Sequence, residues 1–216
     1  MRLRRHLTLA GLCLAVIAAT IAVGPSQRAW DRLSMTSAWL SLALLCGALA
    51  IGPWRVLTTG RPALNSYPRR DMAIWAGLAG LLHVYAGTVV AMTADYVAQF
   101  VKAADGWPPA AIRNQLFMWG ATAGYLVGLI VLMLLALSND RSLRWLGARR
   151  WKRLHRASYA ALMLTALHGL AFQVLEARPL VLIALTSAAA ILVVGLQLAA
   201  RRAAINARLE GPTHPD

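Results

Sequence analysis

Six apolar segments constrain this chain more than any other feature of its sequence. Four are 19 to 22 residues long, close to the ~20 that a helix needs to cross a bilayer. The first is at the short limit for a span, and the second falls just below that limit. The segments are Leu7–Val23, Ala38–Pro53, Met72–Met92, Leu116–Leu137, Ala157–Leu175 and Pro179–Ala199. We predict an all-α, polytopic membrane protein with a bundle of six transmembrane helices at residues 7–199, a short N-terminus at 1–6 and a polar tail at 200–216.

The composition agrees with a membrane protein and excludes several soluble classes. Only 14% of the residues are charged, against about a quarter in soluble domains. The net charge is +14, but the basic residues fall between apolar runs instead of along one soluble face, which excludes a nucleic-acid-binding domain. Cys13 and Cys46 lie inside apolar segments without CxxC spacing, so neither a zinc site nor covalent haem attachment is predicted.

Basic residues predict the orientation in the membrane. With a cytoplasmic N-terminus, 17 of the 22 Lys and Arg fall in cytoplasmic segments and 5 fall outside. This bias predicts a multi-pass membrane protein with both termini in the cytoplasm. Arg2, Arg4 and Arg5 also resemble the start of a signal peptide. We nevertheless expect the first helix to be retained. The apolar run Leu7–Val23 is longer than the usual apolar core of a signal peptide, which has ~7–15 residues.

Two histidines lie inside apolar segments, where histidine is costly and therefore a functional candidate. His83 follows Met72 by about three helical turns, and His168 follows Arg156 by slightly more, on helices that run in the same direction. At about 1.5 Å per residue their depths are ~16 and ~18 Å. Matching depths predict that both bind one haem iron. Gly80 and Gly87, on the same helix face as His83, are expected to leave room for the flat macrocycle. The alternative is that each histidine bonds a carbonyl or hydroxyl group across the bundle.

His155 indicates a second, inner site that has only one histidine. It precedes His168 by 13 residues, just before the fifth segment begins, and on one continuous helix would lie ~20 Å closer to the cytoplasm. The matching positions on the third segment are Arg69 and Arg70, and arginine is not an iron ligand. A lost site, a five-coordinate second haem, an FMN site and a quinone site all remain open. His6 and His214 are expected to be solvated.

A cluster of basic residues surrounds His155: Arg149, Arg150, Lys152, Arg153 and Arg156. Its function is either to anchor the topology or to bind an anion, for which haem propionates, a flavin phosphate and anionic lipid are all suitable. We expect Arg150 and Arg153 to contact such a cofactor.

The longest predicted outer connection runs from Thr93 to Gln115, and its Tyr96 and Trp107 suit the membrane surface. We expect a periplasmic electron acceptor to dock there, near Trp107. No GxGxxG motif follows a strand, so a flavin- or nicotinamide-binding domain is absent from the sequence.

Short motifs accompany the histidines. They are Gly52-Pro53-Trp54-Arg55 at the end of the second segment, Arg69-Arg70 and Trp75 before His83, and then Leu146-Gly147, Trp151, Leu154-His155, Tyr159 and His168. With the spacings from Arg70 to His83 and from Trp151 to His168, they resemble the ferric reductase-like transmembrane domain family, a six-helix haem core. The chain is most similar to its MsrQ (YedZ) subfamily, the membrane haem subunits of bacterial methionine sulfoxide reductase systems.

The resemblance implies electron transfer across the inner membrane through b-type haem. The donor would be a quinol or a cytoplasmic flavin reductase, and the acceptor a periplasmic, MsrP-like molybdopterin protein. His83, His155 and His168 match the family's haem histidines. The chain would then be an electron-transfer subunit of an oxidoreductase system without a dehydrogenase domain. The alternatives are a stand-alone ferric or quinone reductase, and a haem-free scaffold or transporter, against which the lack of an internal repeat argues.

Overall fold

The structure, a computed structural model, describes residues 2–23, 28–60, 67–102 and 107–209, and all regular secondary structure in these ranges is helical. Arg61, Asp105 and His214 lie outside the described residues. Each of the six apolar segments lies in a helix long and apolar enough to cross a membrane, which confirms the predicted six-span, all-α architecture. The long helices are α1 (Arg2–Val23), α2 (Ala29–Thr59), α3 (Tyr67–Ala91), α5 (Ala110–Leu137), α7 (Ala157–Leu175) and α8 (Leu180–Leu209). Between them lie α4 (Ala94–Tyr96), the π-helix η1 (Val97–Val101) and α6 (Asp140–His155).

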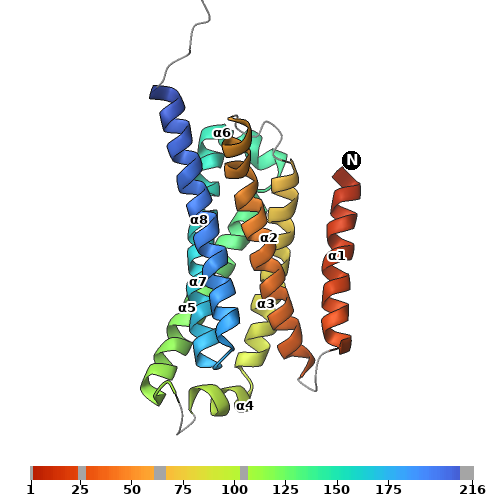
Figure 1. Cartoon of the computed structure of the whole chain (residues 1–216). Helices are drawn as coiled ribbons and strands as arrows, with labels where there is room; N and C mark the ends of the chain where they lie inside the picture. Colours follow the sequence, from red (N-terminus) through yellow and green to blue (C-terminus); the bar gives the residue numbers. More distant parts are fainter. Residues whose placement is uncertain (1, 24–27, 61–66, 103–106, 210–216) are drawn as a thin grey trace, which may run out of the picture.

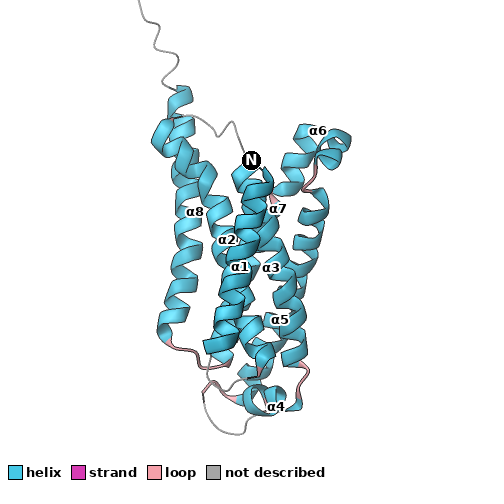
Figure 2. Ribbon diagram, turned by 90° about the vertical axis from the view of Figure 1, so that its right-hand side faces the viewer, coloured by secondary structure: helices cyan, strands magenta, loops and turns pink. Residues whose placement is uncertain are grey.

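Five of the long helices form a closed ring. α2 packs against α3 and α8, α5 packs against α3 and α7, and α7 packs against α8, while α1 lies outside the ring against α2 and α3 (Figure 1). The start of α1, α6 and the end of α8 lie at one end of the bundle, and α4 lies at the other (Figures 1 and 2). The first and last described residues therefore lie on the same side, as an even number of spans requires. The end that holds α6 is called the inner end below, and the end that holds α4 the outer end.

Several helices extend beyond the apolar segments that predicted them. α2 begins at Ala29 instead of Ala38, α8 continues past Ala199 to Leu209, and α5 begins at Ala110, inside the expected outer connection. Hydropathy marks only the part of a helix that crosses the hydrocarbon. A helix satisfies its own backbone groups, so it can continue into polar surroundings.

α2 does not end at Pro53, as its motif suggested, but continues to Thr59 and Gly60. Proline has no N–H, so the carbonyl group of Leu49 loses its helical donor. Gln197 of α8 replaces that donor: its Nε2 donates to the Leu49 oxygen at 2.8 Å. The Tyr159 hydroxyl of α7 donates in turn to Gln197 Oε1 at 3.2 Å. These two bonds join α2, α7 and α8 at the one point where the ladder of α2 is interrupted.

We expect Gln197→Leu to destabilise the bundle, because it leaves the buried Leu49 carbonyl without a donor. A buried unsatisfied carbonyl costs about 1–3 kcal/mol, and each kcal/mol lowers the melting temperature by about 2–4 °C in a chain of this size. Adding Pro53→Ala restores a backbone N–H at position 53 and should recover most of the loss. Thermal unfolding of the single and double variants in detergent measures both effects. Equal losses in the two variants would contradict the role of Gln197.

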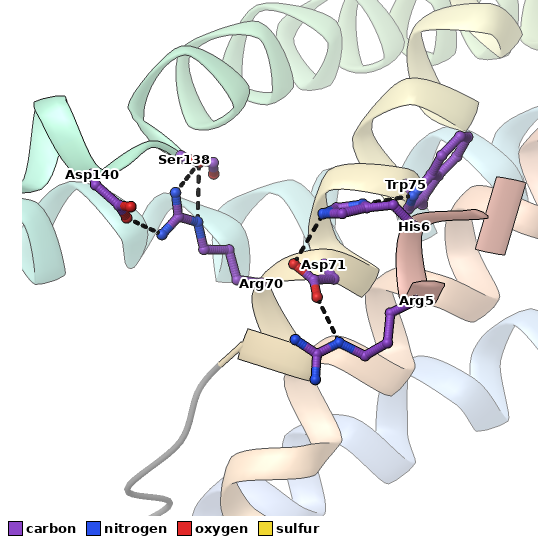
Figure 3. A network of polar contacts seen from close by, with 7 residues as sticks. All are labelled: Arg5, His6, Arg70, Asp71, Trp75, Ser138 and Asp140. Carbon is purple, nitrogen blue, oxygen red and sulfur yellow. Dashed lines mark hydrogen bonds and ion pairs between the residues drawn. The ribbon is translucent and has the colours of Figure 1, made fainter. Parts of the chain in front are cut away.

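The inner end of α5 is capped by side chains from distant parts of the sequence. Trp151 of α6 donates its Nε1 to the Leu137 oxygen at 2.9 Å. Arg70 of α3 donates to the Ser138 oxygen from Nε at 3.0 Å and Nη2 at 2.7 Å, and its Nη1 contacts Asp140 at 2.6 Å (Figure 3). These contacts satisfy carbonyl groups that a helix end leaves without partners.

Asp71, the residue after Arg70, connects α3 to the start of α1 (Figure 3). Its carboxylate is buried, accepts a hydrogen bond from Arg5 Nε at 2.9 Å and lies 3.3 Å from His6 Nε2. Trp75 Nε1 donates to His6 Nδ1 at 3.2 Å. The expectation that His6 is solvated was therefore wrong, because the packing of α1 against α3 brings it to a buried acid.

Candidate metal and cofactor site

His83 on α3 and His168 on α7 face each other across the ring of helices. Their Nε2 atoms are 3.4 Å apart, and their ring centroids are separated by 5.6 Å. The matching depths predicted from the sequence are confirmed by this contact. The predicted alternative, in which each ring bonds a backbone carbonyl, is also present, because the second nitrogen of each ring makes that contact.

The second nitrogens determine how the rings are protonated. His83 Nδ1 lies 2.9 Å from the Ser34 oxygen on α2, and His168 Nδ1 lies 2.8 Å from the Gly120 oxygen on α5. A carbonyl oxygen only accepts, so both Nδ1 atoms are donors. In a neutral imidazole the other nitrogen then carries a lone pair. With this tautomer in both rings, the two Nε2 lone pairs point toward the same place, where a bound proton or metal ion would contact both rings.

Glycines on α5 provide the room for this arrangement. Gly120, Gly124 and Gly128 follow one another at intervals of four and therefore share one helix face. A Cβ atom at Gly124 would lie 2.7 Å from His168 Nδ1, which is closer than such contacts allow. We did not predict these glycines as site residues, although their spacing is visible in the sequence.

Gly80 and Gly87, which were expected to face a macrocycle, also line the cavity. Their own Cβ positions, however, approach side chains of α2. A Cβ atom would meet Ser41 Oγ at 3.0 Å from Gly80 and Ser34 Oγ at 3.3 Å from Gly87. These two glycines therefore permit the close packing of α2 against α3.

One cavity of ≈ 1600 Å³ passes through the ring of helices. It runs from Tyr96 and Glu176 at the outer end, past His83 and His168, to His155 at the inner end. Pockets for a single small ligand usually measure about 300–1,000 Å³. The cavity is therefore larger than a pocket for one small ligand usually is.

His155 lies at the inner end of this cavity, where no second histidine is found among the described lining residues. Its ring stacks on Trp151 with centroids 3.7 Å apart, and its Nδ1 lies 3.1 Å from the Trp151 oxygen. Arg70, the position from which a ligand was sought, is bound to Ser138 and Asp140 instead. The inner site thus has one histidine, as the sequence indicated.

The cations that line the inner end differ from those we expected to contact a cofactor. Arg150 and Arg153 are exposed and are not among the lining residues, whereas Lys152 and Arg156 are. The reason is helical spacing, since Ala148, Trp151, Lys152 and His155 share one face. The basic side chains that line this end are Arg69, Arg70, Lys152, Arg156 and Arg201.

The outer end contains a polar network of one buried and two half-buried side chains. Tyr96 was expected at the membrane surface but is buried, and its hydroxyl donates to Glu176 Oε1 at 3.0 Å. Arg178 Nε donates to Glu176 Oε2 at 2.7 Å. Burial and the Glu176 carboxylate raise the pKa of Tyr96 above its ordinary value, so its hydroxyl stays protonated and remains a donor. Trp107, the other expected surface residue, is 79% exposed.

The donor set at the two facing histidines suits one kind of metal group. In the described part of the chain, no group of three or more His, Cys, Asp or Glu residues is arranged to hold a metal ion. A bare zinc ion takes three or four protein ligands. Haem iron brings four ring nitrogens of its own and needs only axial ligands, for which two histidines suffice.

Comparison of the chain with protein families, with curated proteins and with solved structures finds no match. The resemblance seen in the sequence therefore remains a prediction.

Proposed function

We propose that the protein transfers electrons across the membrane through a non-covalent b-type haem bound between His83 and His168. The observation that supports this most directly is the pair of Nε2 lone pairs 3.4 Å apart, each oriented by a backbone hydrogen bond at Nδ1. Bound haem would supply a one-electron Fe³⁺/Fe²⁺ couple. Because electron transfer through haem needs no catalytic side chain, the proposal assigns no catalytic residue to this chain.

The distances allow this ligation after a small adjustment. An imidazole nitrogen binds a transition metal at about 2.0–2.1 Å, so two opposite nitrogens must lie about 4 Å apart. The two Nε2 atoms would then have to separate by about 0.6–0.8 Å from their present distance of 3.4 Å. Ser34 and Gly120 hold the rings through hydrogen bonds that also make the ligating nitrogens more basic.

The two ends of the cavity support a direction of transfer. The inner end is lined by cations and His155, which suits an anionic donor such as a reduced flavin, or a quinol from the membrane. We propose the inner end as the cytoplasmic one, from the bias of the basic residues. The acceptor would meet the outer end near Trp107, and an MsrP-like periplasmic protein is the partner that the sequence resemblance implies. Reduction of a ferric chelate or a quinone at the same end is the alternative.

The experiment that tests the proposal is a reduced-minus-oxidised optical spectrum of the purified protein with a pyridine haemochrome assay. We expect a b-type α band and about one haem per chain, bound between His83 and His168. A protein purified from haem-replete cells without a Soret band would overturn the proposal.

Gly124 provides a prediction that depends on the position of the His168 ring. Gly124→Ala should displace the ring and lower haem content or shift the α band, because the new Cβ atom would lie 2.7 Å from Nδ1. Perturbing a group that orients a metal ligand costs about 10–100-fold in affinity. Gly195→Ala is the matched control, since a Cβ atom there has no neighbour within 4 Å. Equal haem content in the two variants would contradict the placement of His168.

A further inference from the structure

The helix between the fourth and fifth spans, α6, is cationic and lacks a buried side. Its 16 residues contain one acid, Asp140, and none of them is buried. Its Lys and Arg residues are Arg141, Arg144, Arg149, Arg150, Lys152 and Arg153. The ring of transmembrane helices is complete without α6, so packing into the core does not explain its composition.

The contacts of α6 fix its level relative to the bilayer. It begins directly after α5, and α7 follows it at Ala157. Trp151 bonds the Leu137 oxygen at the end of α5, and Arg70 holds the first residue of α6 through Asp140 (Figure 3). Because α5 and α7 both cross the membrane, a helix held to their ends lies at the bilayer surface. In both views α6 lies at the same end of the bundle as the start of α1 and the end of α8 (Figures 1 and 2).

Exposed apolar side chains alternate with the cations of α6. Trp145 is 83% exposed, and Leu143 and Leu154 are also exposed. Gly147, with φ 70°, interrupts the helical geometry between the two halves. Cationic helices that also carry Trp and Leu lie in the interface of a bilayer, with the apolar groups inserted and the cations at the headgroups.

We propose that α6 binds the headgroups of anionic phospholipids at the inner face of the membrane. An acidic protein partner would match the charges, but it would leave unexplained the exposed Trp145 and the attachment of α6 at bilayer level. Each Lys or Arg near an anionic surface contributes about fivefold to the association constant. The proposal concerns lipid alone and does not depend on haem binding.

The first test measures lipid selectivity with the full-length protein in bilayers. Spin-labelled phosphatidylglycerol and phosphatidylcholine report, by electron paramagnetic resonance, which lipid the protein immobilises. We expect the wild type to prefer phosphatidylglycerol, and Arg141→Gln/Arg144→Gln/Arg149→Gln to lower that preference at least fivefold. Salt should weaken the preference, because the Debye length falls from about 30 Å at 0.01 M to about 3 Å at 1 M.

The matched control is Lys102→Gln, which removes one positive charge at the outer end, compared with Arg144→Gln. Only the latter should change the selectivity. Equal effects of the two variants, or a wild type without lipid preference, would overturn the proposal.

The second test separates a lipid from an acidic protein as the occupant. Lipids brominated close to the headgroup should quench the fluorescence of Trp145, measured as the difference between the wild type and Trp145→Phe. If α6 is instead exposed to solvent and binds a protein, the brominated lipids will not quench the fluorescence of Trp145. That result would show that the lipid proposal is wrong.

Discussion

Replacing either His83 or His168 with alanine is expected to abolish binding of the proposed haem. Each substitution leaves the opposite Nε2 without a partner across the ring. Changes in groups that merely orient a ligand already lower metal affinity about 10–100-fold, so loss of the ligand itself should lower haem content at least tenfold. The measurement is the pyridine haemochrome content of protein purified in equal amount, with the reduced α band as a second signal.

His155→Ala is the control for this experiment. His155 belongs to the inner end of the cavity and stacks on Trp151, so its loss should leave the bis-histidine spectrum in place. It should slow reduction by quinol or reduced flavin from the inner side. Wild-type haem content in both His83→Ala and His168→Ala would exclude the proposed site. Complete haem loss in His155→Ala would instead assign the main ligand to the inner end.

The sequence predicted the six spans and the facing histidines because both follow from distance along a helix. A rise of about 1.5 Å per residue converts position into depth, so His83 and His168 are found at one level without knowledge of packing. The same reasoning placed His155 alone at the inner end, and the structure agrees with this position.

Position along a helix does not predict which helices are neighbours. Contacts between side chains of different helices could therefore not be predicted from the sequence. Gln197 carries no sign in the sequence that it will replace the missing N–H of Pro53, since the two residues lie on helices far apart in the chain. His6 and Tyr96 were assigned to polar surroundings because hydropathy treats each position alone. Their partners, Asp71 and Glu176, become visible only after α1 packs on α3 and the outer connection folds over α7.

The second large effect is expected at Asp71. Its side chain is 1% exposed, and a carboxylate buried next to the hydrocarbon is costly unless cations compensate it. Arg5→Ala removes the guanidinium group that donates to Asp71 at 2.9 Å. Removing one partner of a buried pair costs about 3–5 kcal/mol, and the lower end applies because Arg5 itself is 37% exposed. This corresponds to a fall of roughly 6–12 °C in melting temperature.

A double-mutant cycle separates the loss of the pair from a general effect on α1. Asp71→Asn removes the charge that needs compensation, so Arg5→Ala should cost much less in that background. Arg4→Ala removes the same charge from an exposed neighbouring position and should have little effect in either background. If Arg4→Ala and Arg5→Ala were equally harmful, Asp71 would not be the reason that the N-terminal segment matters.

The same contact bears on whether α1 is removed as a signal peptide. Cleavage after α1 would take away both Arg5 and His6 and leave Asp71 as a buried acid at the start of α3. That loss is expected to exceed the one from Arg5→Ala alone, because the contact of His6 with the carboxylate is removed as well. We therefore expect the intact mass of the purified protein to include α1. We also expect a form truncated after Val23 to be recovered only when Asp71→Asn accompanies the truncation. A stable truncated protein that retains Asp71 would show that the contacts of α1 with this carboxylate are not needed for stability.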